Sequence, residues 1–334
     1  MRSLLRTRVR TDGLAGSVKT EVMKNRLLYG TVMFIICASV LILTFYVSGL
    51  VYDIFILILM ILAAHEMTNA LAYKFDKPGF LMQVITILVS YALFKTVSVL
   101  TFNNDPYGFH AIMAYFIALV SMAIIIFVAN MASSRRTGES VIASIFCMIY
   151  PVMIMFFLIA INHLPGAEKG LAFTDWVYES STPNFRAISI IMVFIAASSS
   201  DIFAFAFGCT LKGPKFAPMI SPKKTIAGAM GGFLGGIIGG AIVFGISFTG
   251  VGGLTGLHND VWISLVLYLS LGLCIGVATE VGDLMASYIK RYCGVKDYST
   301  LIPGHGGIMD RIDGMMIAAF VTYIYMAVLV YVTS

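Results

Sequence analysis

Residues 287–313, SYIKRYCGVKDYSTLIPGHGGIMDRID, form a polar segment between two apolar stretches, 261–279 and 313–332. Each apolar stretch is near the length of roughly 20 residues that a helix needs to cross a bilayer. The polar segment carries basic side chains, aspartates, a histidine and a run of glycines. This arrangement predicts a helical membrane protein with a site for phosphate groups beside the membrane.

Apolar stretches of this kind recur throughout the chain. Its 334 residues are 59% hydrophobic and only 12% charged, about half the charged fraction of a soluble globular protein. We therefore predict an all-α fold, a polytopic integral membrane protein. Its nine transmembrane helices are expected at 28–46, 50–66, 80–100, 110–130, 140–161, 187–208, 225–248, 261–279 and 313–332. Residues 27–334 then form one membrane-embedded domain, which follows a basic tail at residues 1–26.

Basic residues predict the orientation of these helices, because lysine and arginine concentrate in cytoplasmic loops. If the N-terminus lies inside, 19 of the 22 basic residues fall in cytoplasmic segments, and two, Lys169 and Arg186, fall outside. We therefore expect the N-terminus inside and the C-terminus outside. The cytoplasmic tail 1–26 lacks the apolar core of a secretory signal, although an organellar presequence is an alternative. The net charge of +5 reflects loop cations that attract anionic lipids, so no nucleic-acid partner is needed.

Two groups of carboxylates lie at the ends of the polar segment. Asp283, Ser287 and Lys290 share one face if the eighth span continues as a helix. Asp310 and Asp313 likewise project to one side at the start of the last span, where the helix dipole favours anions. Three carboxylates on two helices suit a hard cation such as Mg²⁺. From spacing alone, solvated charges or helix caps are an equal alternative.

A second polar group begins inside the sixth span. Asp201 follows three serines there, and Lys224 and Thr225 lie in a Ser-Pro-Lys-Lys-Thr element that starts at Ser221. An ionised residue inside a span is costly, so function is the default hypothesis for Asp201. The rival interpretation is hydrogen bonding between helices and a lysine cluster at the membrane interface.

Other residues are expected to be structural. Glycines recur every four residues in the seventh span, which is typical of a face where another helix approaches closely. These glycines are Gly228, Gly232, Gly236 and Gly240. Asp53 and Lys95 lie in the outer halves of neighbouring spans and are predicted to form a buried pair. Glu66 is expected at the membrane interface, at the inner end of the second span.

The polar segment resembles, position for position, the signature of the phosphatidate cytidylyltransferase family, also called CDP-diacylglycerol synthases. So many polar matches at fixed spacing are specific. The neighbourhood of Asp201 and the Ser-Pro-Lys-Lys-Thr element are also similar to the family. Residues 198–313 are therefore taken as the signature-bearing catalytic region. The matching positions in the polar segment are Ser287, Lys290, Arg291, Lys296, Asp297, Ser299, Pro303 to Gly307, Asp310, Arg311, Ile312 and Asp313.

The resemblance implies transfer of a cytidylyl group from CTP to phosphatidate, which gives CDP-diacylglycerol and pyrophosphate for phospholipid biosynthesis. It implies Asp283, Asp310 and Asp313 as ligands of Mg²⁺, with a second cation left open. Ser287 and Lys290 join these aspartates as catalytic residues. Substrate binding is expected of Asp201, Ser221, Lys224, Thr225, Arg291, Lys296, His305, Gly306, Gly307 and Arg311. For His305, a role as a polar turn residue is equally open.

The same resemblance implies CTP, phosphatidate and membrane lipids as partners, while a homodimer stays an open alternative to a monomer. We expect an integral protein of the bacterial inner membrane with its active site facing the cytoplasm. One rival is a cytidylyltransferase for another lipid phosphate. A transporter is a weaker rival, because it does not explain why the polar residues lie on one side.

Ala227 and Ala286 depart from the family pattern, which commonly carries acidic or amide side chains there. Both alanines flank signature residues. We therefore expect the two positions to adjoin the same cavity, with their losses compensating each other.

Overall fold

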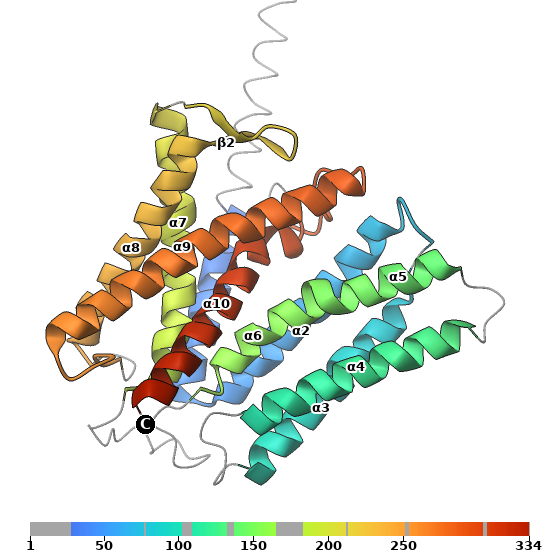
Figure 1. The fold of residues 1–334 in the computed structure, drawn as a ribbon, viewed down its shortest axis with the longest axis horizontal. Coiled ribbons are helices and arrows are strands. Elements are labelled where there is room, and N and C mark those ends of the chain that lie inside the picture. The colour runs from blue at the N-terminus through green and yellow to red at the C-terminus, as the bar shows by residue number, and fades with distance from the viewer. Residues whose placement is uncertain are drawn as a thin grey trace, which may run out of the picture.

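The computed structural model describes residues 28–76, 78–101, 109–131, 137–164, 183–211, 213–250, 254–302 and 306–333. Most of this part is helical (Figure 1). Within the described residues, nine helical segments are long and apolar enough to cross a membrane, as predicted. The orientation of the termini stays a prediction, and the tail 1–26 lies outside the described residues.

The helices differ slightly in extent from the predicted spans. The first is Leu28–Tyr46. The others are α2 (Gly49–Leu71), α3 (Phe80–Thr101), α4 (Phe109–Met131), α5 (Gly138–Cys147), η1 (Met148–Met153), α6 (Ile154–Ile161), α7 (Phe185–Leu211), α8 (Ile226–Ser247), α9 (Val261–Tyr292) and α10 (Met309–Thr333). Segments α5, η1 and α6 together form one span, Gly138–Ile161.

Helix α9 is much longer than its predicted span, which ended at residue 279. It runs for 32 residues, begins at the N-cap Asp260 and ends at Tyr292. Apolar length measures only the part of a helix that lies in the bilayer, so the polar turns beyond it were missed. Lys290 and Arg291 in the last turn complement the helix dipole, and Gly294 follows with a positive φ of 74°. Asp283, Ser287 and Lys290 therefore lie on one continuous helix, as their predicted common face requires.

The fifth span is interrupted in its middle. Tyr150 has φ −129° and ψ 107°, outside the helical range, and Pro151 follows it. Proline has no N–H to donate and its ring clashes with the preceding turn, which explains why the helix breaks there. The break separates α5 from α6.

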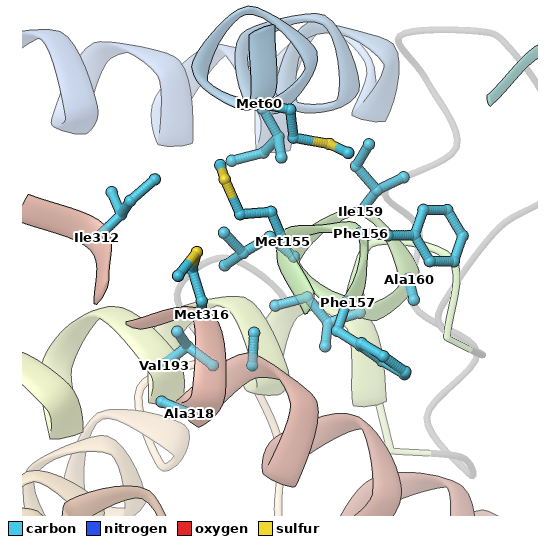
Figure 2. Close-up of a cluster of buried hydrophobic side chains, with 14 of the residues drawn as sticks. Met60, Met155, Phe156, Phe157, Ile159, Ala160, Val193, Ile312, Met316 and Ala318 are labelled. Carbon is cyan, nitrogen blue, oxygen red and sulfur yellow. The ribbon is translucent and has the colours of Figure 1, made fainter. Parts of the chain in front are cut away.

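Helix α6 lies in the hydrophobic core. All eight of its residues except Ile154 are buried, and a helix that is apolar on every side is expected in a protein interior. Figure 2 shows Met155 and Ile159 of α6 between Met60 of α2 and Met316 of α10, with Val193 of α7 close by. The first part of the chain therefore packs directly against the helices that carry the signature residues.

Helix α8 approaches α7 on one side and α9 on the other (Figure 1). A Cβ atom added to Gly235 would lie 2.8 Å from the Cβ of Phe203 on α7, and one added to Gly236 would lie 2.9 Å from the Cα of Gly276 on α9. These separations are too short for any side chain. The predicted glycine packing face is confirmed, and the structure adds a second one, made by Gly231, Gly235 and Gly239 against α7.

A short antiparallel hairpin joins α7 to α8. It comprises β1 (Lys215–Ala217) and β2 (Ser221–Thr225), with Lys215 paired to Thr225 and Ala217 to Ser221. The sequence did not predict strands here, because Ser-Pro-Lys-Lys-Thr shows no alternation of apolar and polar residues. The hairpin places Lys224 beside α9.

Candidate active site

Lys224 of β2 lies between two carboxylates of α9. Its Nζ atom is 2.7 Å from Oε2 of Glu280 and 2.7 Å from Oδ2 of Asp283. Burial alone would lower the pKa of Lys224, but the charges of Asp283 and Glu280 outweigh burial and raise this pKa. The ammonium group is therefore kept charged. We call Lys224, Glu280 and Asp283 the Lys224 cluster.

Further charged side chains surround the Lys224 cluster. Asp201 of α7 interacts electrostatically with all three of its members and with Arg311. Asp313 of α10 interacts with Asp283 and Asp201. The cluster therefore brings together residues that lie far apart in sequence, on α7, β2, α9 and α10. The side chain of Asp283 is 38% exposed, so one of its carboxylate oxygens can reach a ligand.

Asp310 has different surroundings from Asp283 and Asp313. Its Oδ1 atom is 2.7 Å from Nζ of Lys290, and its Oδ2 atom accepts hydrogen bonds from the backbone N–H groups of Tyr298 and Gly307 at 2.9 and 3.0 Å. These contacts join the end of α9, the following loop and the start of α10. In this arrangement, Asp310 fixes Tyr298 and Gly307 in the segment between α9 and α10 and neutralises Lys290.

Glu66 of α2 makes a second set of contacts with the same loop. Its carboxylate accepts hydrogen bonds from the hydroxyl of Ser299 and from the backbone N–H groups of Ile308 and Met309. Glu66 is only 3% exposed, so the protein itself covers its side chain. Its position at the membrane interface stays a prediction, and α2 continues beyond it to Leu71.

The remaining predicted substrate-binding residues and the predicted catalytic residue Ser287 have different surroundings. Thr225 is buried and caps α8, because its hydroxyl oxygen accepts a hydrogen bond from the N–H of Gly228 at 3.1 Å. Gly306 has φ 86°, which favours glycine, and its N–H bonds to the carbonyl of Ile302. His305 lies outside the described residues. The other positions are partly or fully exposed at the same end of the fold, namely Ser221, Ser287, Arg291, Lys296 and Arg311.

Gly307 is buried and packs on Glu66, because a Cβ atom added there would lie 2.7 Å from that carboxylate carbon. Its predicted contact with substrate therefore stays a prediction, while its contact with Glu66 explains the need for glycine.

Sequence reasoning missed Glu280 and Glu66 as parts of this site. Both are acidic residues in or beside apolar stretches, and that is the signal that could have found them, since such residues are costly unless they are paired. Glu280 lies three residues before Asp283, on the same helix face. The partners of Glu66 are more than 230 positions away in the sequence, so no local pattern indicates them.

The predicted pair of Asp53 and Lys95 belongs to a separate polar cluster. Lys95 is 3.9 Å from Asp53, but closer partners of this buried carboxylate are Asn162 at 2.7 Å, His163 at 2.9 Å and Tyr91 at 3.0 Å. Asp53 and Glu66 lie near opposite ends of α2, about 20 Å apart at 1.5 Å per residue. The cluster around Asp53 is therefore distant from the contacts that Glu66 makes with Ser299, Ile308 and Met309.

The two alanine departures have different surroundings. Ala286 is completely buried, and its carbonyl accepts a hydrogen bond from the hydroxyl of Tyr298 at 3.1 Å. Ala227 is partly exposed at the start of α8. A glutamate at position 286 would place a charge in the protein interior, which argues against the expectation that both positions adjoin one cavity.

The carboxylates at this site have the oxygen ligands that a hard cation prefers, and the partly exposed side chain of Asp283 makes them accessible to one. Asp283 and Asp313 offer oxygen atoms from two helices, and Asp313 uses one oxygen to accept the N–H of Gly314 at 2.9 Å. In the part of the chain that the structure describes, no three His, Cys, Asp or Glu side chains form a complete metal-binding group. Mg²⁺ usually takes one or two carboxylates together with substrate phosphates and water, so this donor set is compatible with it.

Comparisons with known proteins agree with the geometry. The chain is 38% identical over 144 residues to a phosphatidate cytidylyltransferase of Brucella abortus. The matched region covers 43% of this chain and 48% of the relative. It is 35% identical over 136 residues to one of Helicobacter pylori, and this match covers 41% of this chain and 46% of the relative. It is 34% identical over 168 residues to one of Rickettsia bellii, and this match covers 50% of this chain and 67% of the relative. The chain thus spans about half the length of the Brucella and Helicobacter relatives that it matches.

The match to the family as a whole is more extensive. A sequence model described as "Cytidylyltransferase family" matches residues 24–329. This range includes eight described spans in full and most of α10, together with every residue of the Lys224 cluster and the loop held by Asp310 and Glu66. We conclude that the chain belongs to the cytidylyltransferase family.

Proposed function

We propose that this protein transfers the cytidylyl group of CTP to phosphatidate and releases pyrophosphate. The observation that carries the proposal is the meeting of Lys224 with Asp283 and Glu280, near Asp201, Asp313 and Arg311. A site that mixes cations with carboxylates in this way suits two anionic substrates. The names of the relatives support the same substrates.

The reaction requires one bond to form and one to break. A phosphate oxygen of phosphatidate attacks the α-phosphorus of CTP, and the bond from this phosphorus to the bridging oxygen of the β-phosphate breaks. Pyrophosphate leaves with that oxygen, and the products are CDP-diacylglycerol and pyrophosphate. Phosphatidate is already ionised near neutral pH, so the site needs no strong base. Its main tasks are to hold the two anions in line and to neutralise their charge.

Each side chain of the site then has a distinct task. Arg311 and Lys224 would bind phosphate oxygens, and exchange of one carboxylate partner for phosphate would leave Lys224 still paired with Glu280. Lys290 is held by Asp310 at the end of α9. Asp283 and Asp313 are the carboxylates that would hold Mg²⁺, whereas Asp310, the third predicted ligand, is paired with Lys290. When bound, Mg²⁺ supplies charge neutralisation at the transferred phosphate and the departing pyrophosphate.

The decisive experiment measures the reaction directly. Purified protein in detergent is incubated with labelled CTP, Mg²⁺ and phosphatidate, and organic extraction should recover a lipid-soluble cytidine product with equimolar pyrophosphate. Product with a polyprenyl phosphate but none with phosphatidate would indicate the rival acceptor. If no lipid phosphate gives product while the protein is folded, the proposal is wrong.

We also propose that the site faces the cytoplasm across a bacterial inner membrane. The exposed tip of the hairpin, at Met219, should then lie inside, and Asn259, in the loop between α8 and α9, should lie outside. The positive-inside distribution of basic residues supports this orientation.

Single cysteines at these two positions test the orientation. In a variant whose five native cysteines are replaced, Asn259→Cys should react in intact cells with a membrane-impermeant maleimide. Met219→Cys should react only after the cells are opened. The reverse pattern, or equal labelling of both cysteines in intact cells, would contradict the predicted topology.

A further inference from the structure

Glu66 comes from a part of the chain that lies far from the signature in sequence. It sits near the end of α2 and is almost completely buried. A buried carboxylate is costly unless hydrogen bonds satisfy it. Here the Ser299 hydroxyl donates to Oε1 at 2.6 Å, the N–H of Ile308 donates to Oε1 at 2.9 Å, and the N–H of Met309 donates to Oε2 at 2.8 Å.

These three contacts hold both ends of the turn that leads into α10. Ser299 lies before the turn, and Ile308 and Met309 lie at the beginning of the helix. The first N–H groups of a helix lack partners within the helix, and a carboxylate there also complements the helix dipole. Gly307 contacts the same carboxylate, and a Cβ atom at this position would collide with it. Gly307 and the start of α10 are therefore packed closely around Glu66.

The part of α10 that Glu66 holds carries charged groups of the site. Asp310 is in the first turn of α10 and binds Lys290, and Asp313 follows one turn later beside Asp283. A shift in the start of α10 would move both aspartates together, because they are on one rigid helix. A displacement of about 1 Å in a reacting constellation can lower its rate by roughly 100-fold.

We propose that Glu66 is a positioning residue, which fixes Ser299, Gly307 and the start of α10 so that Asp313 and the ion pair of Asp310 with Lys290 keep their places in the site. Glu66 acts through these groups and does not itself touch the reacting atoms. This inference rests on the proposed function, since the reaction defines which geometry is productive. It also predicts a change in the turn itself that can be measured without any substrate.

The Glu66→Gln variant tests the proposal with little change in shape. Glutamine has one oxygen and one NH₂ group, so it cannot accept hydrogen bonds at both positions and places N–H against the N–H of Met309 or Ile308. We expect kcat/KM for CTP to fall about 100-fold. We also expect KM for CTP to rise, because a displaced α10 holds the nucleotide phosphates less well. A partial loss of folded protein would lower the rate but leave KM unchanged.

Two further variants sharpen this test. Glu139→Gln is the matched control, because Glu139 is an exposed glutamate in the first turn of α5, and its kinetics should equal those of the wild type. Ser299→Ala removes one of the three hydrogen bonds and should give a smaller loss than Glu66→Gln. The double variant should lose less than the product of the two single effects, since both changes disturb the same contact.

Hydrogen exchange of the protein without substrate provides the independent measurement. In Glu66→Gln, the peptide that contains Ile308 and Met309 should exchange about tenfold faster, while the core of α6 stays protected. Unchanged exchange there, or wild-type kcat/KM and KM for CTP, would overturn the proposal. Lower activity with an unchanged KM would make Glu66 merely structural, and would overturn it too. If the wild type forms no lipid-soluble cytidine product, the proposed function is wrong, and the exchange result still decides whether Glu66 holds the turn.

Discussion

The Asp283→Asn variant should turn over CTP and phosphatidate about 10³-fold more slowly than the wild type, because removal of one preorganised charge from such a site typically costs 10²–10³-fold or more. Asparagine keeps the shape of the side chain and removes only its negative charge. That charge is partly exposed, lies 2.7 Å from Lys224 and interacts with Asp201 and Asp313. The measurement is the initial rate of lipid-soluble cytidine product at saturating CTP.

The structure explains why this variant should still fold. Lys224 keeps its second partner, since Glu280 lies 2.7 Å from the same Nζ atom. The usual penalty for leaving a buried cation without a partner is therefore avoided. Asp283→Asn should melt within a few degrees of the wild type in detergent, so its low activity reports on the site and not on the fold.

The same helix offers a matched control. Asp260 caps the other end of α9 and accepts hydrogen bonds from the N–H groups of Trp262 and Ile263. Asparagine is an equally good N-cap, so Asp260→Asn should have wild-type activity. Near-normal turnover of Asp283→Asn would show that this carboxylate is not part of the catalytic machinery. A similar loss in both variants would show that the assay reports the stability of α9.

The spans were predictable from the sequence because a bilayer imposes a length and an apolar composition on every helix that crosses it. The limits of the helices were not predictable in the same way. Helix α9 continues to Tyr292 through residues that are polar enough to resemble a loop. The break at Tyr150 and Pro151 lies inside an apolar stretch, and composition alone predicts that this stretch is one continuous span.

The site was predictable only where its residues are close in sequence. The spacing of Asp283 and Lys290 places them on one helix, and the structure agrees. The partner of Lys290 is Asp310, however, and the partners of Lys224 are Glu280 and Asp283. Such pairings depend on how α9 packs against α10 and β2. No spacing rule contains this information, since the contacts join different elements of the chain.

Gly236→Ala should have the largest effect on folding. Gly236 lies where α8 crosses α9, and a Cβ atom there would come within 2.9 Å of the Cα of Gly276 and even closer to the carbonyl oxygen of Gly272. The added methyl group meets backbone atoms, which cannot rotate away. Overpacking of this kind costs about 1–3 kcal/mol or more, and here it also pushes α9, with Glu280 and Asp283, away from Lys224.

Gly245→Ala is the matched control for this variant, because it makes the same change in the same helix at a position with no heavy atom within 4 Å of the added Cβ among the described residues. Alanine favours a helix over glycine by about 1 kcal/mol, so Gly245→Ala should be as stable as the wild type or more so. Melting in detergent and initial rates should therefore separate the two alanines: Gly236→Ala loses both stability and activity, and Gly245→Ala loses neither. Equal stability of the two variants would mean that α8 and α9 do not cross as closely in the membrane as the glycines indicate. The placement of Lys224 against Glu280 and Asp283 would then need another cause.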